Sequence, residues 1–120
     1  MRSRIDAILV IRQGGEALSQ SVASIRAQAA RPGRLLIVDT TADSTVPAVY
    51  EAALEGSAIA VDTLSLPFST SFPEAVEKAM EHLYPVESEI NQESWVWLLR
   101  DDVVCYDSAL AQLALSVEAA

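Results

Sequence analysis

The chain has 120 residues, of which 51% are hydrophobic, and it contains four glycines and five prolines. These values favour one folded domain with a single core and exclude a low-complexity or disordered chain. The formal net charge of −9 disfavours nucleic acid and anionic membrane surfaces as partners. No apolar run approaches the roughly 20 residues that a membrane-spanning helix needs. Cys105 is the only cysteine, which excludes a disulfide framework and indicates a reducing, cytoplasmic compartment.

The first half of the chain opens with a strand, a helix and a second strand. Ile5–Ile11 is a continuous apolar run typical of a buried strand, and Arg12–Gly15 ends it. A helix is predicted over about Glu16–Ala30, because apolar residues recur there every three or four positions. The residues of this stripe are Leu18, Val22, Ile25 and Ala29. The second strand is predicted over Arg34–Asp39.

The middle of the chain continues the alternation of strands and helices. Thr40–Thr45 is a polar loop, Val46–Glu55 a short helix, and Ala58–Leu64 the third strand. Ser71 stands three residues before Glu74, which is the capping-box pattern of a helix start. The apolar stripe predicted for this helix consists of Val76, Met80 and Leu83.

The last part of the chain contains a loop, a strand and a helix. Pro85–Ser94 is acidic and polar, which indicates a loop, and Trp95–Leu99 is the fourth strand. The two tryptophans of this strand are two residues apart, so they share one face and are expected to pack in the core. Asp107 or Ser108 caps the last helix. Its apolar residues are Leu110, Leu113 and Val117.

Four strands that alternate with four helices predict right-handed crossovers and a mainly parallel sheet. The fold class is therefore α/β, a three-layer α/β/α arrangement of Rossmann-like type. There is no internal repeat and no linker, so residues 1–120 are predicted to form one domain. The chain stops within an amphipathic segment, and we expect it to be part of a longer protein.

Ligands of open α/β sheets bind beyond the carboxyl ends of the strands, so the polar residues that follow the strands are the candidates for a site. These are Arg12, Gln13, Gly14 and Gly15 after the first strand, Asp39, Thr40 and Thr41 after the second, and Arg100, Asp101 and Asp102 after the fourth. Adjacent carboxylates suit Mg²⁺ or Mn²⁺, which takes one or two carboxylates together with substrate phosphates. Such a cation would let an acidic protein hold a nucleoside diphosphate.

Each candidate also has a purely structural interpretation. Asp101 and Asp102 are equally typical of a solvated turn, and Asp39 of a residue that bonds the turn after a strand. The glycine pair after the first strand lacks the P-loop pattern and favours a tight turn over a phosphate loop. His82 is the only histidine and is expected at the surface, near the end of its helix.

Three blocks of sequence, taken with their order and spacing, carry a resemblance to a known family. The first is Ala7–Leu18 followed by Ser21–Gln28, the second is Leu36–Thr45, and the third is Trp95–Val103. Together they resemble the strand–turn–helix, the Asp-rich loop and the Asp-x-Asp strand of the family 2 glycosyltransferases of GT-A fold. The resemblance covers nearly the whole chain. It implies that residues 1–120 are the nucleotide-sugar-binding half of such an enzyme.

The resemblance implies roles for individual residues. Asp39 would contact the base, Asp101 the ribose or the metal shell, and Asp102 a Mg²⁺ or Mn²⁺ ion that bridges the diphosphate. The implied nucleotide-binding set is Asp39, Ile11, Gln13, Thr40 and Asp101, and the implied metal ligands are Asp102 and Asp101. The sequence departs from the family at Arg100, where the first Asp of Asp-x-Asp is expected, and at Ile11 and Gln13, where a small hydroxyl residue and Asn are usual.

The expected activity is metal-dependent transfer of a sugar from a nucleotide-diphospho-sugar to a glycan or lipid-linked acceptor. By the resemblance, the acceptor site and the catalytic base lie beyond residue 120, so this chain alone is expected to be inactive. The alternative is a non-catalytic GT-A-like module that serves assembly or regulation in cell-envelope polysaccharide synthesis. A receiver-like signalling domain is disfavoured, because Arg12 and Gln13 stand where paired acids are needed.

We expect a cytoplasmic location, with the inner face of the membrane as an open alternative for the full-length protein. A homodimer is a further open alternative, because the missing half would normally cover part of this one and its absence leaves apolar surface exposed.

Overall fold

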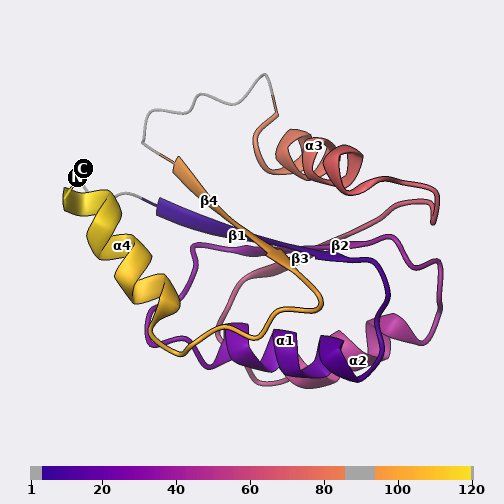
Figure 1. Cartoon of the computed structure of the whole chain (residues 1–120), viewed down its shortest axis with the longest axis horizontal. Helices are drawn as coiled ribbons and strands as arrows, with labels where there is room; N and C mark the ends of the chain where they lie inside the picture. The colour runs from indigo at the N-terminus through magenta and orange to yellow at the C-terminus, as the bar shows by residue number, and fades with distance from the viewer. Residues whose placement is uncertain (1–3, 86–93, 120) are drawn as a thin grey trace.

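The computed structural model describes residues 4–85 and 94–119, and within these ranges the chain alternates strands with helices (Figure 1). The elements are β1 (Arg4–Ile11), α1 (Glu16–Arg26), β2 (Leu35–Asp39), α2 (Val46–Leu54), β3 (Val61–Ser65), α3 (Phe72–Leu83), β4 (Ser94–Arg100) and α4 (Ala109–Ala119). The strands pair in parallel in the order β3-β2-β1-β4. This arrangement confirms the predicted α/β fold and its parallel sheet.

The sheet separates two hydrophobic clusters, and β1 contributes to both. Its residues Ala7, Leu9 and Ile11 pack with α1 and α2 on one face. Ile8 and Val10 pack with α3 on the other face. Alternating side chains of a central strand point to opposite faces, so a strand covered on both sides has to be apolar throughout. That requirement explains the continuous apolar run of β1 and produces the three layers seen in Figure 1.

The helix after β1 is shorter than predicted. It ends at Arg26 rather than Ala30, and Ala29 is exposed instead of buried. The backbone N–H of Ala29 donates to the carbonyl of Asp107 at 2.7 Å, and the side chain of Gln28 is buried. The chain therefore leaves the helix to bond the segment before α4. The other apolar residues of the predicted stripe are buried as expected.

Two other elements differ from the prediction in the residues they bury. Strand β3 begins at Val61 rather than Ala58 and is largely exposed, because it forms one edge of the sheet. Helix α3 buries Ala75, Ala79 and Leu83, whereas Met80 is 37% exposed. Residues four apart align on a helix face, and the small alanines let α3 lie close to the sheet.

Strand β4 forms the opposite edge of the sheet and includes Ser94, which the sequence had placed in a loop. The rest of that predicted loop, residues 86–93, lies outside the described residues. Trp97 packs against the core but Trp95 is 40% exposed, so the prediction of core packing holds for one tryptophan.

Helix α4 begins directly after Ser108, as predicted, and buries Leu110. Leu113 is 42% exposed, and the side chain of Val117 lies outside the described residues. None of the described helices has the length and apolar character that crossing a membrane requires.

The strand order places the topological switch point of the sheet, the expected ligand crevice, at the carboxyl ends of β1 and β4. The chain runs from β1 to β2 and β3 on one side, and then returns to place β4 on the other side of β1. Loops that leave neighbouring strands in opposite directions leave a gap between them, and open α/β sheets bind ligands there. The carboxyl ends of β1 and β4 are therefore the first place to look for a site.

Candidate functional site at the carboxyl edge of the sheet

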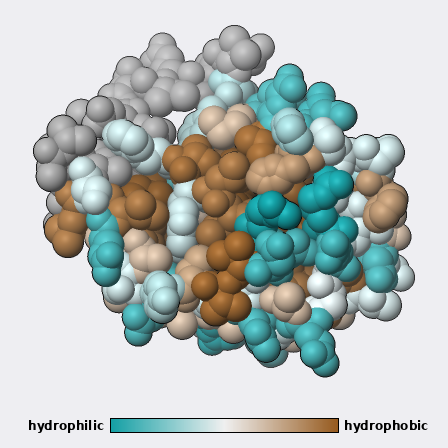
Figure 2. All heavy atoms as spheres, in the orientation of Figure 1, coloured by the Kyte–Doolittle hydropathy of each residue, from teal (hydrophilic) through white to brown (hydrophobic). Residues whose placement is uncertain are grey.

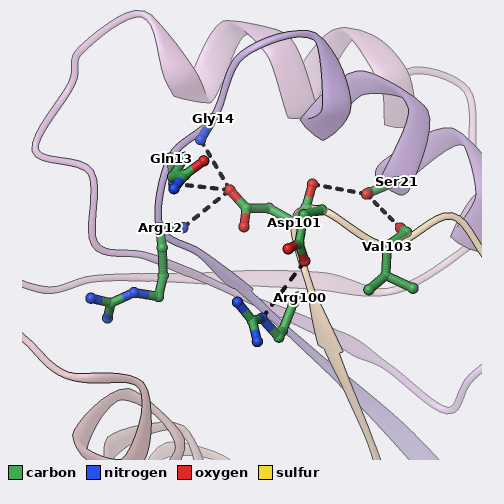
Figure 3. Close-up of polar contacts among 8 residues, drawn as sticks. Arg12, Gln13, Gly14, Ser21, Arg100, Asp101 and Val103 are labelled. Atoms are coloured by element: carbon green, nitrogen blue, oxygen red, sulfur yellow. Dashed lines mark hydrogen bonds and ion pairs between the residues drawn. The ribbon is translucent and has the colours of Figure 1, made fainter.

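Asp101 joins the end of β4 to the turn after β1. Its Oδ2 atom accepts hydrogen bonds from the backbone N–H groups of Arg12 at 3.2 Å, Gln13 at 3.0 Å and Gly14 at 3.0 Å (Figure 3). The residue is only 6% exposed. Three converging N–H dipoles offset the cost of burying a carboxylate. The anion held by this turn is thus the protein's own side chain.

The glycines make this turn conformation accessible. Gly14 has φ 72° and Gly15 has φ 78°, in the left-handed region that other residues rarely adopt. A Cβ atom on Gly14 would also lie 3.2 Å from Cγ2 of Val46. The structure therefore supports the tight-turn interpretation of the glycine pair, and adds that the turn presents its N–H groups to Asp101.

Polar residues on α1 and just after its end hold the loop that carries Asp101. The hydroxyl of Ser21 lies 3.0 Å from the carbonyl oxygen of Asp101 and 2.5 Å from that of Val103 (Figure 3). Ser24 accepts the N–H of Cys105 at 3.1 Å, and Gln28 bonds the carbonyl of Tyr106 and the N–H of Leu110. These residues were not among the predicted site residues, although their spacing of three and four is a helical signal.

Asp39 ends β2 and is only 7% exposed. Its Oδ1 atom accepts the N–H of Thr41 at 2.8 Å and the hydroxyl of Thr41 at 2.6 Å. The expected turn interaction of Asp39 is thus present. Its Oδ2 atom accepts no hydrogen bond from the residues that the structure describes, which leaves that oxygen for a ligand.

Thr40 and Ile11, both in the implied nucleotide-binding set, are buried residues that contact each other. Thr40 donates its N–H at 3.0 Å and its hydroxyl at 2.8 Å to the carbonyl of Ile11. Thr40 is 1% exposed, and the side chain of Ile11 is fully buried in the core. Gln13 is exposed, and its backbone N–H serves Asp101. The buried side chains of Thr40 and Ile11 hold β1 and β2 together, whereas the side chain of Gln13 faces solvent.

A cleft of about 270 Å³ opens beside Asp39 at the ends of β2 and β3. It is lined by Asp39, Ala42, Asp43, Ser44, Pro47, Ser65 and Leu66. Hydrogen bonds from the hydroxyl and N–H of Thr45 hold the pKa of Asp43 below its usual value of 3.8. Asp43 is therefore ionised at neutral pH. A larger open cleft of about 680 Å³ runs along α4, but it lies away from this edge and its only charged lining residue is Asp107.

Arg100 and Asp102 flank Asp101 and are both exposed. Nε of Arg100 lies 3.6 Å from Oδ1 of Asp102, and each side chain is 61% exposed. An exposed pair of this kind contributes only about 0–1 kcal/mol, so either partner is free to change its contacts. Asp102 thus presents an exposed carboxylate just after β4, with a guanidinium beside it.

The carboxylates here form a sparse set of metal ligands. Within residues 4–85 and 94–119, no three His, Cys, Asp or Glu side chains converge on one point. Oδ2 of Asp101 is committed to the turn, which leaves its Oδ1 and the carboxylate of Asp102. Mg²⁺ commonly takes one or two carboxylates and completes its shell with phosphate and water, so these oxygens fit such an ion only together with a phosphate ligand.

Two polar clusters elsewhere serve packing. Nε2 of His82 lies 2.6 Å from Oδ2 of Asp62, so the histidine links α3 to β3 and is partly exposed, as expected. Asp6 is fully buried in β1, where it accepts the hydroxyl of Tyr84 at 2.6 Å and lies 3.9 Å from Nε of Arg34. Asp6 was not among the predicted functional residues, although an acid inside an apolar strand signals a buried partner.

Comparison with known proteins assigns no family to this chain. No protein-family model matches the sequence. No curated protein matches it either, so its function has to follow from the residues at the carboxyl edge.

Proposed function

We propose that the chain is the donor-binding half of a glycosyltransferase of GT-A type, which binds a nucleotide-diphospho-sugar along the carboxyl edge of the sheet. One observation carries this proposal: the cleft beside Asp39 and the exposed carboxylate of Asp102 lie on the same edge, at the two ends of the strand order. Parallel strands are spaced by about 4.8 Å, so the cleft between β2 and β3 is about 12 Å from the end of β4. An extended nucleoside diphosphate has this reach.

The nucleoside would occupy the cleft beside β2. The open Oδ2 atom of Asp39 is an acceptor for a base N–H or a ribose hydroxyl. Because Oδ1 is held by Thr41, the carboxylate is fixed in orientation before a ligand arrives. Preorganised acceptors of this kind lower the ordering cost of binding.

The diphosphate would extend toward the crevice between β1 and β4. Asp102, with the remaining oxygen of Asp101, would hold a Mg²⁺ or Mn²⁺ ion against it. Such an ion, when bound, stabilises the negative charge of a departing nucleoside diphosphate. The proposed enzyme transfers the sugar to a glycan or lipid-linked acceptor bound by a second half of the protein, so this chain alone would bind donor without transfer.

One observation favours the second candidate function, a non-catalytic GT-A-like module. Arg100 pairs with Asp102 at the place where a cation would sit, and its positive charge opposes a divalent ion. A module that lacked the metal would keep the fold and lose the transfer reaction. Metal-dependent binding separates the two candidates.

The test is calorimetric titration of UDP, GDP and TDP into the chain, with Mn²⁺ or with EDTA. We expect one nucleotide to bind, Mn²⁺ to strengthen binding, and Asp102→Asn to remove the gain that Mn²⁺ brings. Asp39→Asn should weaken binding about ten-fold in both conditions, because a charged hydrogen bond is worth about 1.5–3 kcal/mol. Asp107→Asn, at an exposed acid away from the crevice, is the matched control.

The results divide the alternatives. Nucleotide binding that depends neither on Mn²⁺ nor on Asp102 favours the non-catalytic module over the enzyme. If the folded chain binds none of the three nucleotides in either condition, the nucleotide-sugar proposal is wrong.

A further inference from the structure

Arg12 and Arg100 are brought to the same short segment, the entry to α3. Nη1 of Arg12 donates to the carbonyl of Thr70 at 2.7 Å. The guanidinium carbon of Arg100 lies 5.8 Å from the ring centre of Phe72. Thr70 and Phe72 stand on either side of Ser71, the N-cap of α3. Both guanidinium groups therefore lie at the start of α3.

The strand register supports the same placement. Arg100 pairs with Val10, and Val10 packs on the α3 face of the sheet. Arg12 follows Val10 by two residues, so both arginines leave the sheet toward α3. Figure 3 shows the two side chains on the same side of the turn that Asp101 holds. They lie at the ends of β1 and β4, which are the walls of the crevice.

Both arginines keep donors for a ligand. A guanidinium has five N–H groups, and Arg12 uses one for Thr70. Arg12 forms no ion pair with the residues that the structure describes. Arg100 lies 3.6 Å from Asp102, beyond ordinary hydrogen-bond length, and its side chain is 61% exposed. In a chain with only eight lysines and arginines and a net charge of −9, two cations at one crevice indicate an anionic ligand.

We propose that Arg12 and Arg100 form a diphosphate-binding pair that contacts the phosphates directly and holds them without a divalent ion. Guanidinium groups match phosphate oxygens with paired, charge-assisted hydrogen bonds. Arg100 would turn from Asp102 to phosphate, which frees that carboxylate for a cation and lets a metal add to the affinity. The acids around the pair are Asp101, whose Oδ2 accepts the backbone N–H of Arg12, Asp102 beside Arg100, and Glu74 in the first turn of α3. All three reduce its positive potential. The inference rests on the proposed function for the nucleoside part of the ligand only.

The test uses inorganic pyrophosphate in EDTA, which probes the pair without a nucleoside or a metal. We expect calorimetric binding that weakens as salt is added. Arg12→Ala and Arg100→Ala should each lower the affinity about ten-fold or more, and the double variant should not bind. Arg12→Lys and Arg100→Lys keep the charge but lose the paired N–H donors of the guanidinium, so they should retain only part of the affinity.

Arg26→Ala is the matched control, since Arg26 also donates one hydrogen bond to a backbone carbonyl, that of Ala53 at 3.2 Å. It should bind pyrophosphate like the unaltered chain. Circular dichroism of each variant shows whether it folds. If an alanine variant does not fold, the lysine variant at the same position provides the comparison.

Three results would overturn the inference: pyrophosphate binding that requires Mn²⁺, equal affinity in the Arg26, Arg12 and Arg100 variants, or no binding by the folded chain. The first leaves the proposed function intact, because a metal would then hold the phosphates. Conversely, arginine-dependent binding of pyrophosphate with no gain from any nucleoside supports the pair and counts against the nucleotide-sugar proposal.

Discussion

At the scale of the residue, one carboxylate oxygen organises the candidate site. Oδ2 of Asp101 gathers three backbone N–H groups and so fixes the turn that carries Arg12. Resemblance assigned Asp101 to ribose or metal, and its Oδ1 atom remains for that role. The structure shows the first of these contacts, the support of the turn, and a ligand role for Asp101 stays a prediction. Its neighbour Asp102 is exposed and paired only with Arg100, so it does not support the turn in this way.

Substitution of Asp101 tests this division of roles. Asp101→Ala leaves three N–H groups without their acceptor and should lower the free energy of unfolding by about 3 kcal/mol. Asp101→Asn keeps an oxygen acceptor and should cost about 1 kcal/mol. Urea denaturation measures both. Asp102→Ala, the control, should change stability by less than about 0.5 kcal/mol, and equal losses at both positions would contradict the assignment.

A second residue-scale contact links α3 to β3 and depends on pH. The hydrogen bond from His82 is the main cause that holds the pKa of Asp62 below its ordinary value of 3.8, and the hydrogen bond from the Thr63 N–H lowers it further. A lowered carboxyl pKa stabilises the fold above the ordinary pKa, and this contribution disappears as pH falls through the lowered value.

Asp62→Asn should therefore destabilise the chain near pH 6 by less than about 1 kcal/mol, since the pair is exposed. The difference from the unaltered chain should shrink as pH falls below about 4. Urea denaturation of both proteins across this range measures it. A difference that stays constant down to the acid transition would show that the ion pair is not its cause.

At the scale of the element, the β1–α1 turn depends on its two glycines. Gly15 combines φ 78° with ψ −164°, a region that essentially only glycine occupies. Gly14 is limited both by its positive φ and by the approach of Val46. This strained connection is what lets three successive N–H groups point at one oxygen.

Replacing either glycine should therefore be costly. Gly14→Ala and Gly15→Ala are each expected to lower the free energy of unfolding by about 1–3 kcal/mol, measured by urea denaturation. Both should also weaken pyrophosphate binding, because the turn positions Arg12. Gly33→Ala is the control, since Gly33 is exposed and its φ is not positive. A loss at Gly33 equal to that at Gly14 would refute the conformational argument.

At the scale of the whole molecule, the edge at β4 is more apolar than the edge at β3. Figure 2 shows apolar side chains grouped on the displayed face, next to a polar region. Exposed apolar residues of β4 and the segments after it are Trp95, Leu98, Val103, Val104, Tyr106, Leu113 and Leu115. An uncovered apolar edge strand favours pairing with another chain.

We therefore expect the chain to self-associate as its concentration rises, with β4 as the contact. Leu98→Lys should shift the population toward monomer with little change in stability, since Leu98 is already 43% exposed. Val61→Lys places the same charge on the β3 edge, where Val61 is 41% exposed, and should leave association unchanged. Sedimentation velocity measures both, and equal effects at the two edges would exclude β4 as the contact.

Local pattern was sufficient to predict the order and type of the elements. The continuous apolar run of β1 indicated a strand buried on both faces, and Ser71 and Glu74 marked the start of α3; Ser71 accepts the N–H of Glu74 at 3.2 Å. The general rule for parallel sheets also placed Asp39, Asp101 and Asp102 at one edge. The first two features depend on residues a few positions apart, and the third follows from the common direction of parallel strands.

What the tertiary structure alone decided is which partner each polar group meets. Asp101 bonds a turn 87 to 89 residues earlier, and Arg12 bonds Thr70, 58 residues later. Periodicity reveals which face an element buries, but not which element packs against that face or which strand lies at an edge. The meeting of two arginines at α3 depends on strand order, and strand order is set by long-range packing.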